Sequence, residues 1–292
     1  MNLLKSIFIT CFTSWLFLLT IYSFTQLARG MEPLLSWLGL ALTVFAPLMF
    51  FLSVFVVKTP RTARHPFEYS LLSGLGLALT MAMSYRYDQV AGTIHVWAGI
   101  TFVGWLVYLR WYSPFHGRNS AALATGSPLP AFQLENMDNH MVSSESFKAR
   151  PHLLLFYRGN WCPFCTAQID ELAAAYQRLH ALGVTVVLIS PQSVEKNRQL
   201  AARFDAPMVF LRDRNGEAAR QLGINHSWGT PMGMQLLGYQ TDTVLPTVIL
   251  TDQNGIIIFS DQTDNYRVRP EPSTFEMIFR KSLDKTEVDD AP

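Results

Sequence analysis

Long apolar runs dominate the first 110 residues of the chain, and shorter apolar segments separated by polar positions begin after about residue 128. A helix needs about 17–25 apolar residues to cross a bilayer. Four runs have roughly this length, namely residues 7–27, 34–57, 69–85 and 90–109. We therefore predict a membrane region over residues 1–111 with four transmembrane helices, of which the Gly-rich third run is the shortest.

Basic residues in the short loops predict how these helices are oriented. With four spans, one side carries Lys5, Lys58, Arg61, Arg64, Arg110 and Arg118, whereas the other carries Arg29 and Arg86. The positive-inside rule then places both termini in the cytoplasm. We expect a multi-pass protein of a bacterial inner membrane with its second domain in the cytoplasm. A periplasmic domain is the alternative if the first run is cleaved or the third does not span.

The second half of the chain has the periods of a mixed α/β domain. Residues 112–127 mix Pro, Gly, Ser and Ala and predict a linker that leaves the membrane. Strands are predicted at 152–157, 184–190, 208–211, 247–251 and 256–259, and helices at 163–182, 193–204, 217–222 and 271–283. This order predicts a central mixed sheet with helices on both faces over residues 128–285, followed by a frayed tail, residues 286–292.

Charge and cysteine content narrow the possible functions. The net charge is +1, so that a nucleic-acid partner has no electrostatic support. Three cysteines are too few for a disulfide-rich secreted scaffold. Two of them, Cys162 and Cys165, lie in the sequence WCPFC, at the point where the first strand of the second domain is predicted to turn into a helix.

Three kinds of chemistry are open to this cysteine pair. A structural zinc ion needs four ligands, and the chain has no second C-x-x-C. A static disulfide between residues three apart closes a small loop and stabilises little. A redox-active pair fits better, because Cys162 would lie at a helix N-terminus, where backbone N–H groups favour the thiolate. Cys165 would lie one turn further, and Pro163 suits the first turn.

The arrangement strand–WCPFC–helix resembles the thioredoxin fold. The sequence VLPTVIL (244–250) supplies a second motif, because Pro246 followed by Thr247 matches the cis-proline of that superfamily. Within the superfamily, FYRGNWCPFC resembles the FYP…C segment of AhpC/TSA-type, peroxiredoxin-like redoxins. Counted from Tyr157, Cys165 falls on their peroxidatic cysteine and Cys162 on a threonine, while Arg158 replaces the proline.

This resemblance implies a catalytic pair, Cys162 and Cys165, that forms a redox-active disulfide without another cofactor and without a metal. It also implies a thiolate-stabilising arginine, with Arg158 and Arg267 as the candidates. The implied substrate groove beside the pair consists of Trp161, Pro163, Phe164, Pro246 and Thr247. An insertion before Pro246, residues 225–243, either shapes this groove or packs on the sheet.

Three functions follow from these observations. The first is a membrane-anchored thiol–disulfide oxidoreductase, in which Cys162 reacts with protein or small-molecule thiols and disulfides and Cys165 resolves. The alternative is a thiol peroxidase, in which Cys165 attacks the peroxide and Cys162 resolves. The third, from a different class, is a non-catalytic membrane adaptor or a metal-binding module.

Overall fold

The computed structural model describes residues 2–86, 91–115, 117–118 and 120–289, which form two compact units. One unit is helical and consists of residues 4–114, and the other consists of residues 115–292 together with residues 1–3. The predicted start of the fourth apolar run, at residue 90, and the end of the predicted tail lie outside the described residues.

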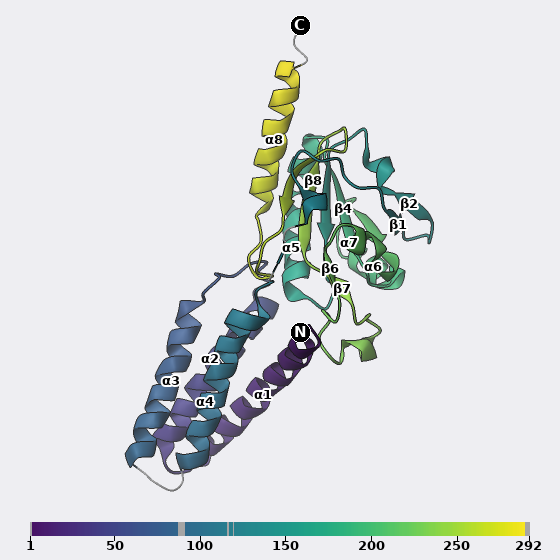
Figure 1. The fold of residues 1–292 in the computed structure, drawn as a ribbon. Helices are drawn as coiled ribbons and strands as arrows, with labels where there is room; N and C mark the ends of the chain where they lie inside the picture. Colours follow the sequence, from purple (N-terminus) through teal and green to yellow (C-terminus); the bar gives the residue numbers. More distant parts are fainter. Residues whose placement is uncertain (1, 87–90, 116, 119, 290–292) are drawn as a thin grey trace. The chain divides into compact units, whose positions relative to one another are not determined.

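Each of the four apolar runs is helical (Figure 1). The helices are α1 (Asn2–Ala28), α2 (Leu34–Val56), α3 (Phe67–Arg86) and α4 (Ala91–Val107), which continues into a π-helical turn, η1 (Tyr108–Tyr112). Two of them, α1 and α2, are long and apolar enough to cross a membrane, a test that a signal sequence or a buried core helix also passes. The helices are confirmed, and their passage through a membrane stays a prediction.

Glycines allow α2 and α3 to pack closely. A Cβ atom on Gly39 would lie 2.8 Å from the carbonyl oxygen of Gly76, and one on Gly76 would lie 2.5 Å from the nitrogen of Thr43. At the same crossing, Ser73 Oγ donates a hydrogen bond of 2.9 Å to the carbonyl of Thr43. Small residues that let two backbones approach in this way are typical of helix contacts in membranes.

The second unit is built on a mixed sheet of seven strands in the order β2-β1-β5-β4-β3-β8-β9. Its strands are β1 (Gln133–Glu135), β2 (Met141–Ser143), β3 (His152–Phe156), β4 (Thr185–Ser190), β5 (Val209–Arg212), β8 (Thr247–Thr251) and β9 (Ile257–Asp261). The central strands β3, β4 and β5 are parallel, whereas β8, β9 and β1 pair antiparallel to their neighbours. A small ladder of β6 (Asn225–His226) and β7 (Thr243–Val244) stands apart.

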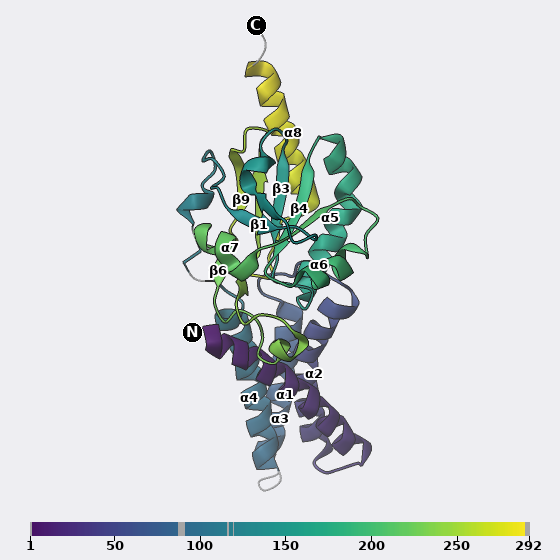
Figure 2. The ribbon, with the colours of Figure 1, turned by 90° about the vertical axis from the view of Figure 1, so that its right-hand side faces the viewer.

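Helices cover both faces of this sheet, as predicted. They are α5 (Pro163–Ala181), α6 (Val194–Ala201), α7 (Glu217–Gln221) and α8 (Pro272–Asp289), with short 3-10 turns η2 (Ala121–Leu123), η3 (Ser144–Phe147), η4 (Arg214–Gly216) and η5 (Met234–Leu237). The two views show α5 and α7 on opposite sides of the strands (Figures 1 and 2). All five residues of β3 are buried, because alternate side chains enter the two layers.

The predicted linker, residues 112–127, is wrong for most of its length, because the domain begins at Phe115. Leu123 is fully buried in the core beneath the sheet. The segment also pairs with the edge strand β9, since Gly126 N donates to the carbonyl of Ile257 and Ile257 N donates to the carbonyl of Ser127. An edge strand offers such unpaired backbone groups, and a short Gly/Ser segment can follow it closely.

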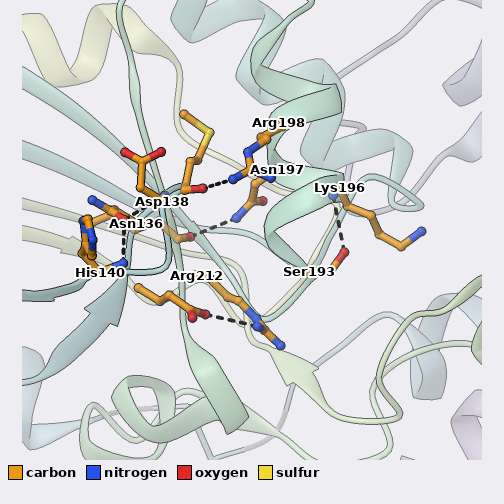
Figure 3. Close-up of polar contacts among 11 residues, drawn as sticks. Asn136, Asp138, His140, Ser193, Lys196, Asn197, Arg198 and Arg212 are labelled. Carbon is orange, nitrogen blue, oxygen red and sulfur yellow. Dashed lines mark hydrogen bonds and ion pairs between the residues drawn. The ribbon is translucent and has the colours of Figure 1, made fainter.

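Two further differences concern short or terminal segments. The predicted tail begins inside α8, which continues to Asp289. The hairpin of β1 and β2 was not predicted, because three-residue strands carry too little periodicity. Its turn is held by Asn136 Oδ1, which accepts from the backbone of Asp138 and His140, and by Arg198 of α6, which donates to the carbonyl of Met137 (Figure 3).

Candidate active site

The turn between β3 and α5 places both cysteines at one end of the sheet. Tyr157 N still bonds to the carbonyl of Ile189, and the backbone then folds so that Cys162 N donates to the carbonyl of Gly159 at 3.1 Å. Gly159 has φ +140°, and a Cβ atom there would lie 2.9 Å from Nε1 of Trp161. This position therefore requires glycine for both conformation and space.

Cys162 is the N-cap of α5 and Pro163 its first residue, as predicted. The backbone N–H of Cys165 donates to the carbonyl of Cys162 at 3.0 Å, which places Cys165 in the first turn. Both sulfurs are free thiols, and the residues are 2% and 0% exposed. The two thiols therefore lie beneath the surface of the domain.

Arg269 is the cation in contact with Cys165. Its Nη2 lies 3.5 Å from the Sγ atom of Cys165. The rest of the guanidinium group is held in place, because Nη1 donates to Gln168 Oε1 at 2.6 Å and Nε donates to the carbonyl of Tyr266 at 3.0 Å. A buried cation oriented by its neighbours stabilises a negative charge without having to reorganise first.

Arg158 supplies a second positive charge. Its guanidinium group lies 4.6 Å from the ring centre of Trp161 and 5.7 Å from that of Tyr266. Its Nη2 donates to the carbonyl of Gly229, and the carbonyl of Arg158 accepts from Thr243 Oγ1 at 2.9 Å. The side chain is buried, so its charge is weakly screened.

These surroundings separate the two thiols in acidity. Burial alone would raise the pKa of Cys165, but a hydrogen bond from Cys162, the charge of Arg269 and a backbone bond and charge from Arg158 lower this pKa to about 5. Burial, followed by the hydrogen bond to Cys165 and its charge, raises the pKa of Cys162 well above its ordinary value. At neutral pH the pair therefore consists of a thiolate at Cys165 and a thiol at Cys162.

This charge distribution is the reverse of the one expected from the helix N-terminus, which would have favoured the thiolate at Cys162. Two adjacent buried sulfurs do not both ionise, because the second charge would be repelled by the first. The hydrogen bond from Cys162 and the charge of Arg269, which contacts Cys165, together place the negative charge on the sulfur of Cys165.

Of the two arginines predicted to stabilise the thiolate, one lies at the site and the other is replaced by a neighbour. Arg158 is one of the two arginines whose charge lowers the pKa of Cys165, and Arg269 is the other. Arg267 is fully buried, but it is Arg269, two residues further along, that contacts the sulfur. The sequence RVR offers both arginines equally, and no local pattern distinguishes them.

Of the predicted groove residues, those next to the cysteines surround the pair. Trp161 packs on Arg158, and Phe164 meets the ring of Tyr266 edge to face at 5.4 Å between ring centres. Pro163 lies between the two cysteines at the start of α5. These residues form the wall of the site.

Pro246 and Thr247 depart from the prediction. The peptide bond before Pro246 is trans, and among the described residues the cis bond is Glu32–Pro33. The carbonyl of Pro246 and the hydroxyl of Thr247 both accept from Nη2 of Arg118, while Thr247 pairs with Phe156 at the start of β8. The expected cis-proline is therefore wrong for this chain, and Arg118 fills the end of the sheet there.

A polar network that was not predicted holds the turn before Cys162. Gln192 Nε2 donates to Asn160 Oδ1 at 2.8 Å, and Asn160 N donates back to Gln192 Oε1 at 2.9 Å. Gln192 also donates to the hydroxyl of Tyr157, and burial raises the pKa of that phenol. Such a closed network resists distortion of the turn.

A small, partly open pocket lies beside the site. It is lined by Arg158, Trp161 and Gln192, and by Thr230 and Tyr239 of the insertion. The insertion thus contributes to the wall of a pocket that reaches the thiolate-stabilising Arg158. Within the described residues, no group of three or more His, Cys, Asp or Glu side chains is placed to hold a metal ion.

Comparisons with known proteins point to one class. Residues 125–260 match the model of the AhpC/TSA family. The chain is 28% identical over 137 residues to a chloroplastic peroxiredoxin Q of Sedum lineare, covering 47% of this chain and 68% of that protein. It is 27% identical over 153 residues to peroxiredoxin Q of Oryza sativa subsp. japonica, covering 50% of this chain and 64% of that protein.

A solved structure of peroxidoxin BcpB from Mycobacterium tuberculosis is also similar. Its TM-score is 0.46 at 18% identity, over 55% of this chain and 97% of that chain. The matches to the two plant proteins span about two thirds of their length.

Proposed function

We propose, on the premise that residues 125–260 form a peroxiredoxin-like redoxin domain of the AhpC/TSA family, that this protein is a thiol-dependent peroxidase in which Cys165 attacks the peroxide. The observation that carries the proposal is the contact between Cys165 Sγ and Arg269 Nη2 at 3.5 Å. Together with Arg158, this contact favours a thiolate at Cys165, and the thiolate is the nucleophilic form of cysteine.

The reaction begins with attack of the Cys165 thiolate on one oxygen of the peroxide. The S–O bond forms while the O–O bond breaks, so that Cys165 is oxidised to a sulfenic acid and the peroxide is reduced. The other oxygen leaves as an alkoxide or hydroxide and takes a proton from water. Arg269 and Arg158 lie where they stabilise this developing negative charge.

Cys162 resolves the intermediate. Its thiol attacks the sulfur of the Cys165 sulfenic acid, a disulfide forms between the two residues, and water leaves. Two equivalents of a small-molecule thiol then reduce this disulfide and regenerate the two cysteines. The raised pKa of Cys162 suits this order of events, because Cys162 stays protonated and does not compete for the peroxide.

Burial favours this assignment over direct exchange with protein disulfides. A protein disulfide has to reach a sulfur atom along the S–S axis, and Cys162 is 2% exposed. A peroxide is small enough to enter such a site. Thiol–disulfide exchange then belongs to the reductive half of the cycle rather than to the first step.

The helical unit is proposed to anchor the enzyme in a bilayer. Two observations support this proposal: the length and hydropathy of α1 and α2, and the close glycine contact between α2 and α3. The bias of basic residues in the loops favours a multi-pass arrangement with the redoxin domain in the cytoplasm of a bacterium. Reporter fusions after residue 292, active in one compartment each, test the orientation.

Single-cysteine variants test the order of reaction. The full-length chain carrying Cys162→Ser is expected to form a sulfenic acid at Cys165 on rapid mixing with peroxide, at a rate close to that of the unchanged protein. Cys165→Ser is expected to lose the fast phase, and Cys11→Ser, which lies outside the redoxin domain, serves as the control. A fast phase that survives in Cys165→Ser and vanishes in Cys162→Ser would overturn the assignment.

A further inference from the structure

The insertion before β8 carries an exposed apolar tip. Leu236 is 92% exposed, Leu237 63% and Trp228 50%, and Met232 in the same loop is also exposed. The loop runs from β6 to β7 and extends away from the main sheet (Figure 1). Four large apolar side chains gathered on one loop mark an interaction surface rather than ordinary scatter.

Hydrogen bonds within the loop that carries this tip fix its conformation. Its two arms are held together, because Trp228 N donates to Asp242 Oδ1 at 2.9 Å and Thr230 N donates to the carbonyl of Thr241 at 3.1 Å. The 3-10 turn η5, which presents Leu236 and Leu237, lies between two glycines with left-handed backbones, Gly233 at φ +98° and Gly238 at φ +77°. The exposure of the leucines is therefore a property of the folded loop.

A positive charge lies next to the apolar tip. Lys196 of α6 donates from Nζ to the carbonyl of Leu237 at 2.9 Å and lies 4.1 Å from the ring centre of Tyr239. Apolar and aromatic side chains next to a lysine are typical of protein segments that bind at the interface of a bilayer. The apolar groups then lie below the lipid headgroups, and the lysine lies among them.

We propose that this tip, formed by Trp228, Met232, Leu236 and Leu237, docks into the interface of the lipid bilayer that holds the helical unit. The inference rests on the proposed membrane anchoring. Two residues, Ser113 and Pro114, join η1 to the first residue of the redoxin domain. They reach at most about 10 Å, which is less than the radius of gyration of roughly 16 Å for a domain of this size, so that the domain stays at the membrane surface.

Docking of the tip bears on the thiolate site, because the base of the same loop contacts Arg158. Gly229 accepts from the guanidinium group of Arg158, and Thr243 donates to the carbonyl of this residue. The docked loop and the wall of the active site thus form one continuous structure, which holds the site at the membrane surface.

A photoreactive side chain tests the docking in the full-length protein. The protein is reconstituted in nanodiscs of phosphatidylethanolamine with a minority of phosphatidylglycerol, and benzoylphenylalanine replaces Leu236. The control carries the same group at Met277, which lies in α8 of the same domain and is 63% exposed, against 92% for Leu236. After irradiation, lipid adducts and protein–protein adducts are measured by mass spectrometry.

Lipid adducts are expected at position 236 in roughly tenfold excess over position 277, because burial of one leucine side chain changes an equilibrium by about an order of magnitude or more. Leu237→Asp in the same background is expected to lower the adduct yield roughly tenfold. Equal lipid yields at the two positions, or adducts at position 236 that join two copies of the chain, would overturn the proposal.

Peroxide consumption measured on the unirradiated samples separates this inference from the proposed function. Lipid adducts in a protein without peroxidase activity would retain the docking and overturn the function. Full activity with equal lipid yields at both positions would retain the function and overturn the docking.

Discussion

Loss of the positive charge at Arg269 is expected to raise the pKa of the Cys165 thiol. The Nη2–Sγ distance is 3.5 Å, and at an effective dielectric constant of about 20 a unit charge pair at this distance interacts by about 5 kcal/mol. Since one pH unit corresponds to about 1.4 kcal/mol, Arg269→Met is expected to raise the pKa by up to about 3 pH units. The hydrogen bond from Cys162 and the backbone bond and charge of Arg158 remain in this variant and limit the rise.

The consequence for the reaction follows from the thiolate fraction. In the unchanged protein, with a pKa of about 5, Cys165 is almost fully ionised at pH 7. With a pKa raised to about 8, roughly a tenth of the sulfur is ionised, so that the second-order rate with peroxide falls about tenfold and recovers as the pH rises.

The pKa is measured from the pH dependence of Cys165 alkylation by iodoacetamide, resolved from Cys162 and Cys11 by mass spectrometry. Arg280→Met removes an exposed arginine of α8 and is the charge-matched control. Arg269→Lys keeps the charge but cannot contact Gln168 and Cys165 with two separate N–H groups of one plane, and an intermediate pKa of Cys165 is expected. An Arg269→Met protein that is folded and titrates at the original pKa would refute the electrostatic reasoning.

Two glycine substitutions and one pH profile provide further tests. Gly159→Ala is expected to lower the free energy of unfolding by about 1–3 kcal/mol in urea titrations, because its backbone is left-handed and its Cβ atom would meet Trp161, whereas the left-handed but open Gly126→Ala should cost less. An equal loss of unfolding free energy in both variants would contradict the steric conflict with Trp161. Gly76→Ala would place a Cβ atom 2.5 Å from a backbone nitrogen of α2 and is expected to lower the midpoint of thermal unfolding in detergent. Gly99→Ala, with open space around it, should leave the midpoint unchanged. Equal midpoints for the two variants would contradict the close crossing of α2 and α3. Because the pKa of Cys165 in the folded protein is low, its rate of reaction with peroxide should stay level from neutral pH to about pH 6 and fall as the pH drops through about 5. A fall centred near the ordinary pKa of a thiol would contradict the assignment of Cys165 as the thiolate.

Much of the fold was predictable because it depends on local patterns. The apolar runs of the first 110 residues correspond to four helices, and the order of the main strands and helices from β3 onward matches the prediction, to which the structure adds the small ladder of β6 and β7. The start of α5 was also predictable, since a cysteine at the N-cap followed by Pro163 is a local signal. The resemblance to AhpC/TSA-type redoxins that the sequence FYRGNWCPFC suggested was confirmed by the match of residues 125–260.

Errors occurred where a composition has more than one structural outcome. The Pro, Gly, Ser and Ala of residues 112–127 are typical of linkers, yet the second unit begins at Phe115, and Gly126 and Ser127 pair with Ile257 of the edge strand β9. The sequence LPT suggested a cis-proline, but the bond before Pro246 is trans and Arg118 binds its carbonyl. In each case the partner that decides the conformation is distant in the sequence.

The sequence by itself determined that two cysteines meet at the start of a helix next to a buried strand, because periodicity and capping act over a few residues. The tertiary structure alone decided which sulfur carries the charge. That choice depends on Arg269, which contacts Cys165 across 104 residues of chain and is indistinguishable from Arg267 in the local pattern. Electrostatic energy depends on distance in space, and only the folded sheet and its return loops bring that charge to the sulfur.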